Sequence, residues 1–245
     1  MTEILLIVVV LSFSFWVKAV AGFGGPLVAI PLLAPFIGVE QAVVVLALPN
    51  TVANLILLWT NRHAAKSNRK LLTRLLLAGA AGTIGGTVLL TRLDDAVLAV
   101  VLAASVFGYI AMNVLRPEFV LSPERGLALA IPVGAGGGLM HGALGASGTV
   151  FGSFYHSLKL PRDEFVFALT ITFLWFGTLQ IGTLAQLGSF GRERVVQSLI
   201  AVIPVFVVTP LGERLSRSLN AEVFGKVVLA LLATSAIALV VGALA

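Results

Sequence analysis

The chain contains no cysteine and very little charge. Only 11% of its 245 residues are Asp, Glu, Lys or Arg, whereas soluble globular domains carry about 25%. The absence of cysteine excludes disulfides, thiolate metal sites and cysteine nucleophiles. The shortage of charge leaves too few polar groups for a surface solvated by water, which excludes a soluble globular domain.

Hydrophobic residues make up 58% of the chain, and the mean hydropathy is +1.05. They form ten apolar segments: 4–21, 24–37, 40–60, 71–91, 95–115, 126–145, 148–158, 163–187, 195–211 and 221–244. A full membrane span needs about 20 residues, because about 30 Å of hydrocarbon is crossed at about 1.5 Å per residue. We predict an all-α, polytopic transmembrane helical bundle in which segments 24–37 and 148–158 are too short to span.

The basic residues lie mainly between the apolar segments, although the isoelectric point is near 10.1. Insertion topology produces this distribution, so we expect no nucleic-acid partner. The strongly basic loop 61–74 is predicted to be cytoplasmic, which places both termini on the outer side of the membrane. Arg192 and Arg194 disagree with this scheme, because it places their turn outside.

The two halves of the sequence resemble each other. Gly22 and Gly25 align with Gly145 and Gly148 at an offset of 123 residues, in stretches that break the apolar pattern. Each half then contains three further spans. An odd number of full spans inverts the second copy, and inverted repeats around a midplane site are a recurring transporter architecture.

A second set of matches extends the repeat. Gly86 aligns with Gly212 at an offset of 126 residues. We therefore predict two inverted repeats, each a glycine-broken helical hairpin plus three full spans, at residues 1–117 and 126–245. A cytoplasmic linker at 118–125 joins them.

The offset of 123 also pairs Lys18 with His141, each four residues before the first glycine of its break. An ionisable group at membrane depth indicates a functional site, although Lys18 snorkelling to an interface and His141 packed as a neutral residue are equally consistent with the sequence. The helices that begin after the breaks would direct free N–H groups towards a small anion. We predict these substrate-binding residues: Lys18, Gly22, Gly24, Gly25, Asn50, Asn54, His141, Gly145, Ser147, Gly148, Thr149 and Thr170.

Several runs resemble the TauE/SafE family over nearly the whole chain. In the first half they are Ala21-Gly22-Phe23-Gly24-Gly25-Pro26, Pro31-Leu32-Leu33 and the run 47–54. In the second they are the run 142–148, Leu160-Pro161 and Ala168-Leu169-Thr170. The resemblance implies a bacterial inner-membrane exporter of sulfite or an organosulfonate such as sulfoacetate. One departure is Ser147, where the resemblance leads us to expect glycine.

Two other functions fit parts of the sequence. Gly145-Ala146-Ser147-Gly148 matches the nucleophile motif of a rhomboid-type serine protease, but the only histidine after it, His156, lies on the same short segment. An anion channel or an ion-coupled importer would use the same site. We expect a transporter that is not an enzyme, uses no cofactor or metal, and alternates access to its site, and we leave a homodimer open.

Overall fold

The fold is known from a computed structural model that describes residues 2–21, 24–60, 69–115, 120–215, 230, 233–237 and 239–241. Every long apolar run in these ranges forms a helix. The helices are α1 Thr2–Ala21, α2 Gly25–Ile37, α3 Val39–Thr60, α4 Arg69–Leu90, α5 Asp95–Leu115, α6 Pro123–Leu144, α7 Gly148–Ser157, α8 Arg162–Gln186 and α9 Arg192–Leu215. No strand occurs within the described residues, which confirms the all-α prediction.

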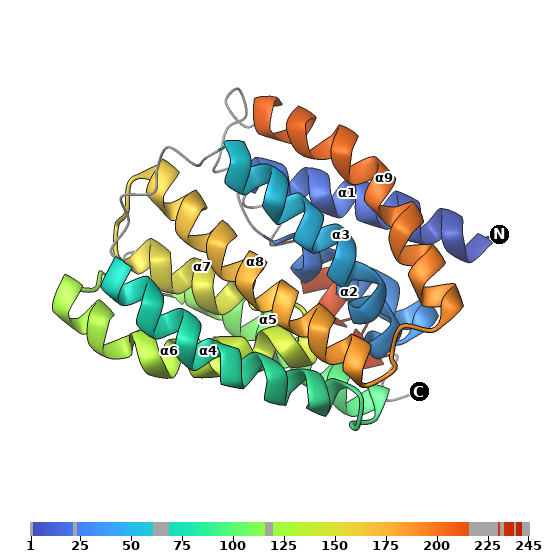
Figure 1. Ribbon diagram of the computed structural model, residues 1–245, viewed down its shortest axis with the longest axis horizontal. Coiled ribbons are helices and arrows are strands. Elements are labelled where there is room, and N and C mark those ends of the chain that lie inside the picture. Colours follow the sequence, from blue (N-terminus) through green and yellow to red (C-terminus); the bar gives the residue numbers. More distant parts are fainter. Residues whose placement is uncertain are drawn as a thin grey trace.

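The helices pack into one bundle whose outer pairs join distant parts of the chain (Figure 1). One flank is formed by α1 and α9, and the opposite flank by α4 and α6. Between them α3 contacts α8 and α9, while α8 contacts α3 and α4. Helices α2 and α7 are the short members, and each packs beside the long helix that precedes it and the one that follows it.

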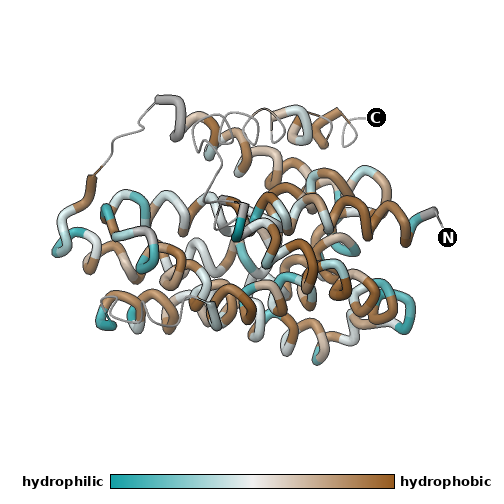
Figure 2. The backbone as a smooth tube through the Cα atoms, turned by 90° about the horizontal axis from the view of Figure 1, so that it is seen from above, coloured by the Kyte–Doolittle hydropathy of each residue, from teal (hydrophilic) through white to brown (hydrophobic). Residues whose placement is uncertain are grey.

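Among the described residues, six helices are long and apolar enough to cross a membrane: α1, α3, α4, α6, α8 and α9. Figure 2 shows hydrophobic residues along the helices and hydrophilic residues mainly near their ends. The protein is therefore a multi-pass membrane protein, as predicted. Helix α5 has 21 residues, and the apolar stretch Asp95–Ala111 lies within it. Most of the predicted segment 221–244 lies outside the described residues.

Both predicted breaks separate helices. Helix α1 ends at Ala21 and α2 begins at Gly25, while α6 ends at Leu144 and α7 begins at Gly148. Left-handed glycines occur at both points, Gly24 with φ 99° and Gly145 with φ 62°. Residues with a Cβ rarely adopt this conformation, which is why glycine occupies the position directly before α2 and the position directly after α6.

Glycines let α4 and α6 approach closely. A Cβ on Gly86 would collide with the backbone of Leu139, and one on Gly142 would collide with that of Thr83. Helices in a membrane associate through such small residues, since lipid provides no hydrophobic driving force between them. On the other flank, a Cβ on Gly212 of α9 would lie 3.0 Å from the Trp16 carbonyl oxygen of α1.

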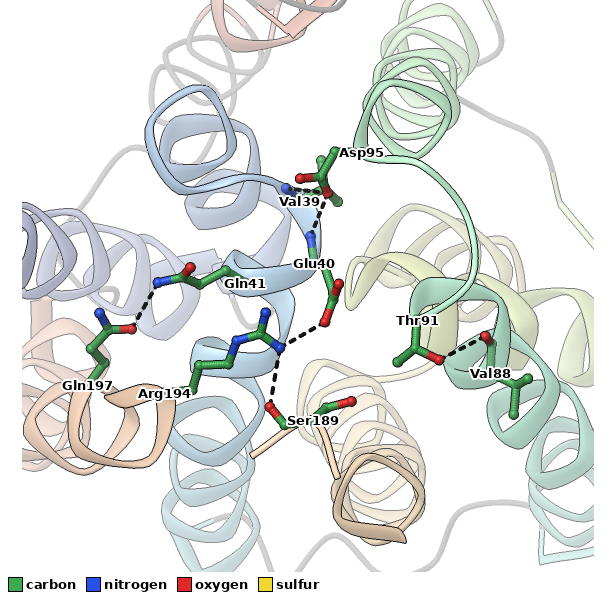
Figure 3. Close-up of polar contacts among 9 residues, drawn as sticks. All are labelled: Val39, Glu40, Gln41, Val88, Thr91, Asp95, Ser189, Arg194 and Gln197. Carbon is green, nitrogen blue, oxygen red and sulfur yellow. Dashed lines mark hydrogen bonds and ion pairs between the residues drawn. The ribbon is translucent and has the colours of Figure 1, made fainter. Parts of the chain in front are cut away.

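A polar network joins the helix starts at one end of the bundle (Figure 3). The Arg194 guanidinium of α9 forms an ion pair of 2.7 Å with Glu40 of α3 and donates to the Ser189 carbonyl oxygen. Asp95 accepts from the backbone N–H groups of Val39 and Glu40, which caps the start of α3. Arg194, which disagreed with the topology scheme, therefore has a structural partner at this end.

Candidate functional site

A small cavity lies between the two breaks. It is lined by one or more residues from each of α1, α2, α3, α6, α7 and α8 and from both breaks: Lys18, Gly24, Pro26, Leu27, Asn50, His141, Gly145, Ala146, Gly148 and Phe173. The fold places it there because each broken helix stops inside the bundle instead of continuing to its surface. A broken helix is tolerated at membrane depth where its backbone lines a cavity or packs in protein.

Lys18 is the only lysine or arginine that the lining contains, and its side chain is 2% exposed. Its Nζ donates to Asn50 Oδ1 at 2.6 Å and to Asn54 Oδ1 at 2.7 Å. Within the described ranges, no Asp or Glu forms an ion pair with it. An ammonium group has three donors, so the two neutral amides leave one donor free and the charge uncompensated.

The amides that hold Lys18 come from α3. Asn50 and Asn54 are four residues apart, which places both on one face of the helix. Because their oxygens face Lys18, their Nδ2 groups point elsewhere, and Asn54 Nδ2 is buried without a partner in the described part of the chain. The first half thus contains buried hydrogen-bond donors on two helices, the Lys18 ammonium on α1 and the asparagine Nδ2 groups on α3.

His141 occupies the corresponding place in the second half and is fully buried. Its Nδ1 lies 2.9 Å from Ser147 Oγ, across the second break. Its ring stacks on Phe173 at 6.1 Å between centroids. Among the described residues, Nε2 has no partner, so this nitrogen remains available at a residue that lines the cavity.

Gln180 of α8 holds the backbone of the second break. Its Nε2 donates to the carbonyl oxygens of His141 and Gly142, each at 3.0 Å. The His141 carbonyl also accepts from the Gly145 N–H, but carbonyls in the last turn of a helix generally have no helical partner, and burial without one is costly. Gln180 therefore stabilises the end of α6 where the chain leaves the helix.

The two helix starts complete the electrostatics of the cavity. The first N–H groups of α2 and α7 lack intrahelical partners, and the helix dipoles make both ends electropositive. Pro26, in the first turn of α2, has no N–H to leave unpaired. A site with two helix starts, a buried lysine and unused donors has the chemistry to bind a small anion.

The structure brings together most of the residues predicted from the sequence. Six line the cavity: Lys18, Gly24, Asn50, His141, Gly145 and Gly148. Three more contact one of these: a Cβ on Gly25 would lie 3.0 Å from the Lys18 side chain, Asn54 binds Lys18, and Ser147 binds His141. Thr149 and Thr170 are buried, with hydroxyls unpaired among the described residues, but they are not among the lining residues. Gly22 lies outside the described residues.

Sequence reasoning did not single out Phe173 or Gln180. For Phe173 a signal existed, because the offset of 123 that pairs Lys18 with His141 also pairs Asn50 with Phe173. For Gln180 the same offset leads to Leu57, so the repeat gives no signal. The remaining sequence signal for Gln180 is that it is a polar residue within an apolar segment.

The contact between Ser147 and His141 resembles the nucleophile and base of a serine hydrolase. A hydrolase also needs a group that orients the base and space for the scissile bond. Within the described residues His141 Nε2 has no partner to orient it, and the ring of Phe173 stacks against His141. The pair fits a hydrogen bond that holds the break together better than it fits a catalytic dyad.

Comparison with known proteins adds one finding. A family model described as "Sulfite exporter TauE/SafE" matches residues 5–239, which is nearly the whole chain. No curated protein and no solved structure matches the chain.

Proposed function

The chain belongs to the TauE/SafE family of membrane transporters, and from that membership we propose that it exports a small sulfur oxyanion. The substrate is sulfite or an organosulfonate such as sulfoacetate. The observation that carries the proposal is the buried Lys18, whose Nζ contacts only neutral amide oxygens and the Phe173 ring among the described residues. A buried charge without a counter-ion is costly, and a bound anion would remove that cost.

The repeat predicted from the sequence is part of the proposal, and the helix contacts support it. In the proposed repeat α1 corresponds to α6, and α4 corresponds to α9. The contacting pair α1 and α9 therefore corresponds to the contacting pair α6 and α4. The glycine contacts agree in detail: Gly86 meets Leu139, and Gly212 meets Trp16. The offset of 126 relates Gly86 to Gly212, and the offset of 123 relates Trp16 to Leu139.

The proposed mechanism is alternating access. Lys18 is 2% exposed and His141 is 0% exposed, so both ionisable groups at the cavity are almost completely buried. An anion can therefore reach them only after helices move. The ion pair between Glu40 and Arg194 links α3 of one proposed repeat to α9 of the other at one end (Figure 3). Breaking this contact is the proposed step that opens this end, which the topology scheme places in the periplasm.

Export in this direction needs no coupling ion. A cytoplasm that is negative inside drives an anion outwards with about 2.3 kcal/mol per charge per 100 mV. We therefore propose a uniporter in a bacterial inner membrane, with both termini in the periplasm. An anion channel and an ion-coupled importer remain the competing functions for the same site.

Flux from loaded proteoliposomes tests the proposal. We expect saturable efflux of radiolabelled sulfite or sulfoacetate, lost in the double variant Lys18→Ala/His141→Ala. Lys70→Ala removes an exposed lysine at the start of α4 and is the matched control. Unchanged efflux in the double variant would sink the site assignment.

The same vesicles separate a carrier from a channel. With alternating access, unlabelled substrate inside should drive transient uphill uptake of labelled substrate, because a carrier that has released label inside returns mostly loaded with the abundant unlabelled substrate. A channel gives no such counterflow. Ser147→Ala addresses the protease alternative: efflux that is only reduced or altered excludes a nucleophilic serine, since a nucleophile is indispensable.

A further inference from the structure

Phe173 and Asn50 occupy equivalent positions but have opposite chemistry. The offset of 123 that relates His141 to Lys18 relates Phe173 to Asn50. Both residues line the cavity. The cavity therefore has an amide in one wall and a hydrocarbon ring at the corresponding place in another.

The ring is held in this wall by its neighbours. Its centroid lies 5.8 Å from Lys18 Nζ, 6.1 Å from the His141 ring and 6.2 Å from the Phe151 ring. The side chain is 6% exposed. The distance to Nζ is within the range of a cation–π contact, so an anion bound by Lys18 would lie next to the ring.

The candidate substrates share one half and differ in the other. Sulfite, sulfonates and sulfate all have three oxygens on sulfur. The fourth position carries a lone pair in sulfite, a carbon in a sulfonate and an oxygen in sulfate. The Lys18 ammonium and the Asn50 amide, which both line the cavity, can donate to the three shared oxygens, whereas a phenyl ring offers no hydrogen bond to the fourth substituent.

From this we propose that Phe173 is the specificity-determining residue, and that it rejects anions in which a polar atom is bonded to sulfur at the fourth position. Such a group would lose its water against the ring without gaining a partner. Sulfite and sulfonates are accepted, and sulfate is excluded. This inference rests on the proposed function and adds the feature of the anion that the site distinguishes.

Binding to the full-length purified protein tests it through ligand-induced thermal stabilisation. Methanesulfonate and sulfamate are the decisive probes, because both are monoanions of similar size that differ in a methyl or an amino group. Sulfite and sulfate form a second pair. We expect the wild-type protein to need about tenfold less methanesulfonate than sulfamate for the same stabilisation, which corresponds to one unsatisfied polar group.

Substitutions at Phe173 assign the selectivity to the ring. F173N copies the residue at the equivalent position and should reduce the methanesulfonate preference to about twofold, since an amide can pair with the fourth substituent. F173L keeps the wall apolar and is the matched control, with the preference retained. F173Y adds one hydroxyl and should improve sulfamate binding, so the role of the ring can be tested even if F173N does not fold.

The outcomes separate the two proposals. Equal binding of both probes by the wild-type protein, or an unchanged preference in both F173N and F173Y, overturns the role of Phe173. An equal loss of preference in F173L does the same. If none of the four anions stabilises the wild-type protein, or if Lys18→Ala leaves binding intact, the proposed anion site itself fails.

Discussion

The two breaks meet at one cavity but provide different things. At the first break, the Lys18 side chain of α1 donates to the amide oxygens of Asn50 and Asn54 on the neighbouring helix α3. At the second, His141 remains with its own break through Ser147, and Gln180 fixes the backbone. The first half thus supplies the basic side chain of the cavity, and the second half supplies a part of the cavity wall whose backbone is held in place by hydrogen bonds. In the proposed repeat, equivalent positions thus have complementary roles.

The clearest way to test this division is to change Lys18 and His141 separately. Lys18→Ala should lower the efflux rate about 100-fold, because it removes charge-assisted hydrogen bonds to the anion. His141→Ala should lower it about tenfold, since a neutral donor contributes less. Initial rates in proteoliposomes measure both. Equal losses would show that the two halves share the charge-binding role.

The flanks allow the repeat itself to be tested. Gly86→Ala and Gly212→Ala should each lower the free energy of unfolding by about 1–3 kcal/mol, because both force packed helices apart. Gly85→Ala is the control, as a Cβ there meets nothing within 4 Å, and it should be neutral or stabilising by up to about 1 kcal/mol. Thermal unfolding in detergent measures the three variants. A tolerant Gly212 beside an intolerant Gly86 would contradict the proposed equivalence.

Gln180 distinguishes the second break from the first, where the proposed offset of 123 leads to Leu57. Gln180→Leu leaves the Gly142 carbonyl oxygen without the side-chain donor seen in the structure, so we expect a loss of about 1–3 kcal/mol in unfolding free energy. Gln186→Leu, at an exposed position of the same helix, should have little effect. Indistinguishable stabilities for the two variants would mean that Gln180 does not support the break.

Much of this structure was predictable from local sequence. Apolar segments bounded the helices to within a few residues, since hydrogen bonding within a segment is obligatory in lipid. The glycines at 24 and 145 marked the breaks, because each position requires a left-handed backbone. Lys18 was predicted as a site residue because a charge at membrane depth is rare.

Other features depend on contacts that no local pattern encodes. The ion pair of Glu40 with Arg194 joins residues 154 positions apart, so a topology count could treat Arg194 only as an exception. Gln180 lies 38 residues from the carbonyl of Gly142 that it binds. Such partners are set by how helices cross, and crossing depends on the whole packed surface.

The sequence by itself determined that this protein lies in a lipid membrane, where its helices and breaks are, and that it belongs to a transporter family. These follow from composition, from backbone hydrogen bonding in lipid, and from residue order. Only the tertiary structure decided that Lys18 binds Asn50 and Asn54, and that Phe173 lines the same cavity. The reason is that a cavity is formed by side chains from several helices, and its shape exists only when those helices are packed together.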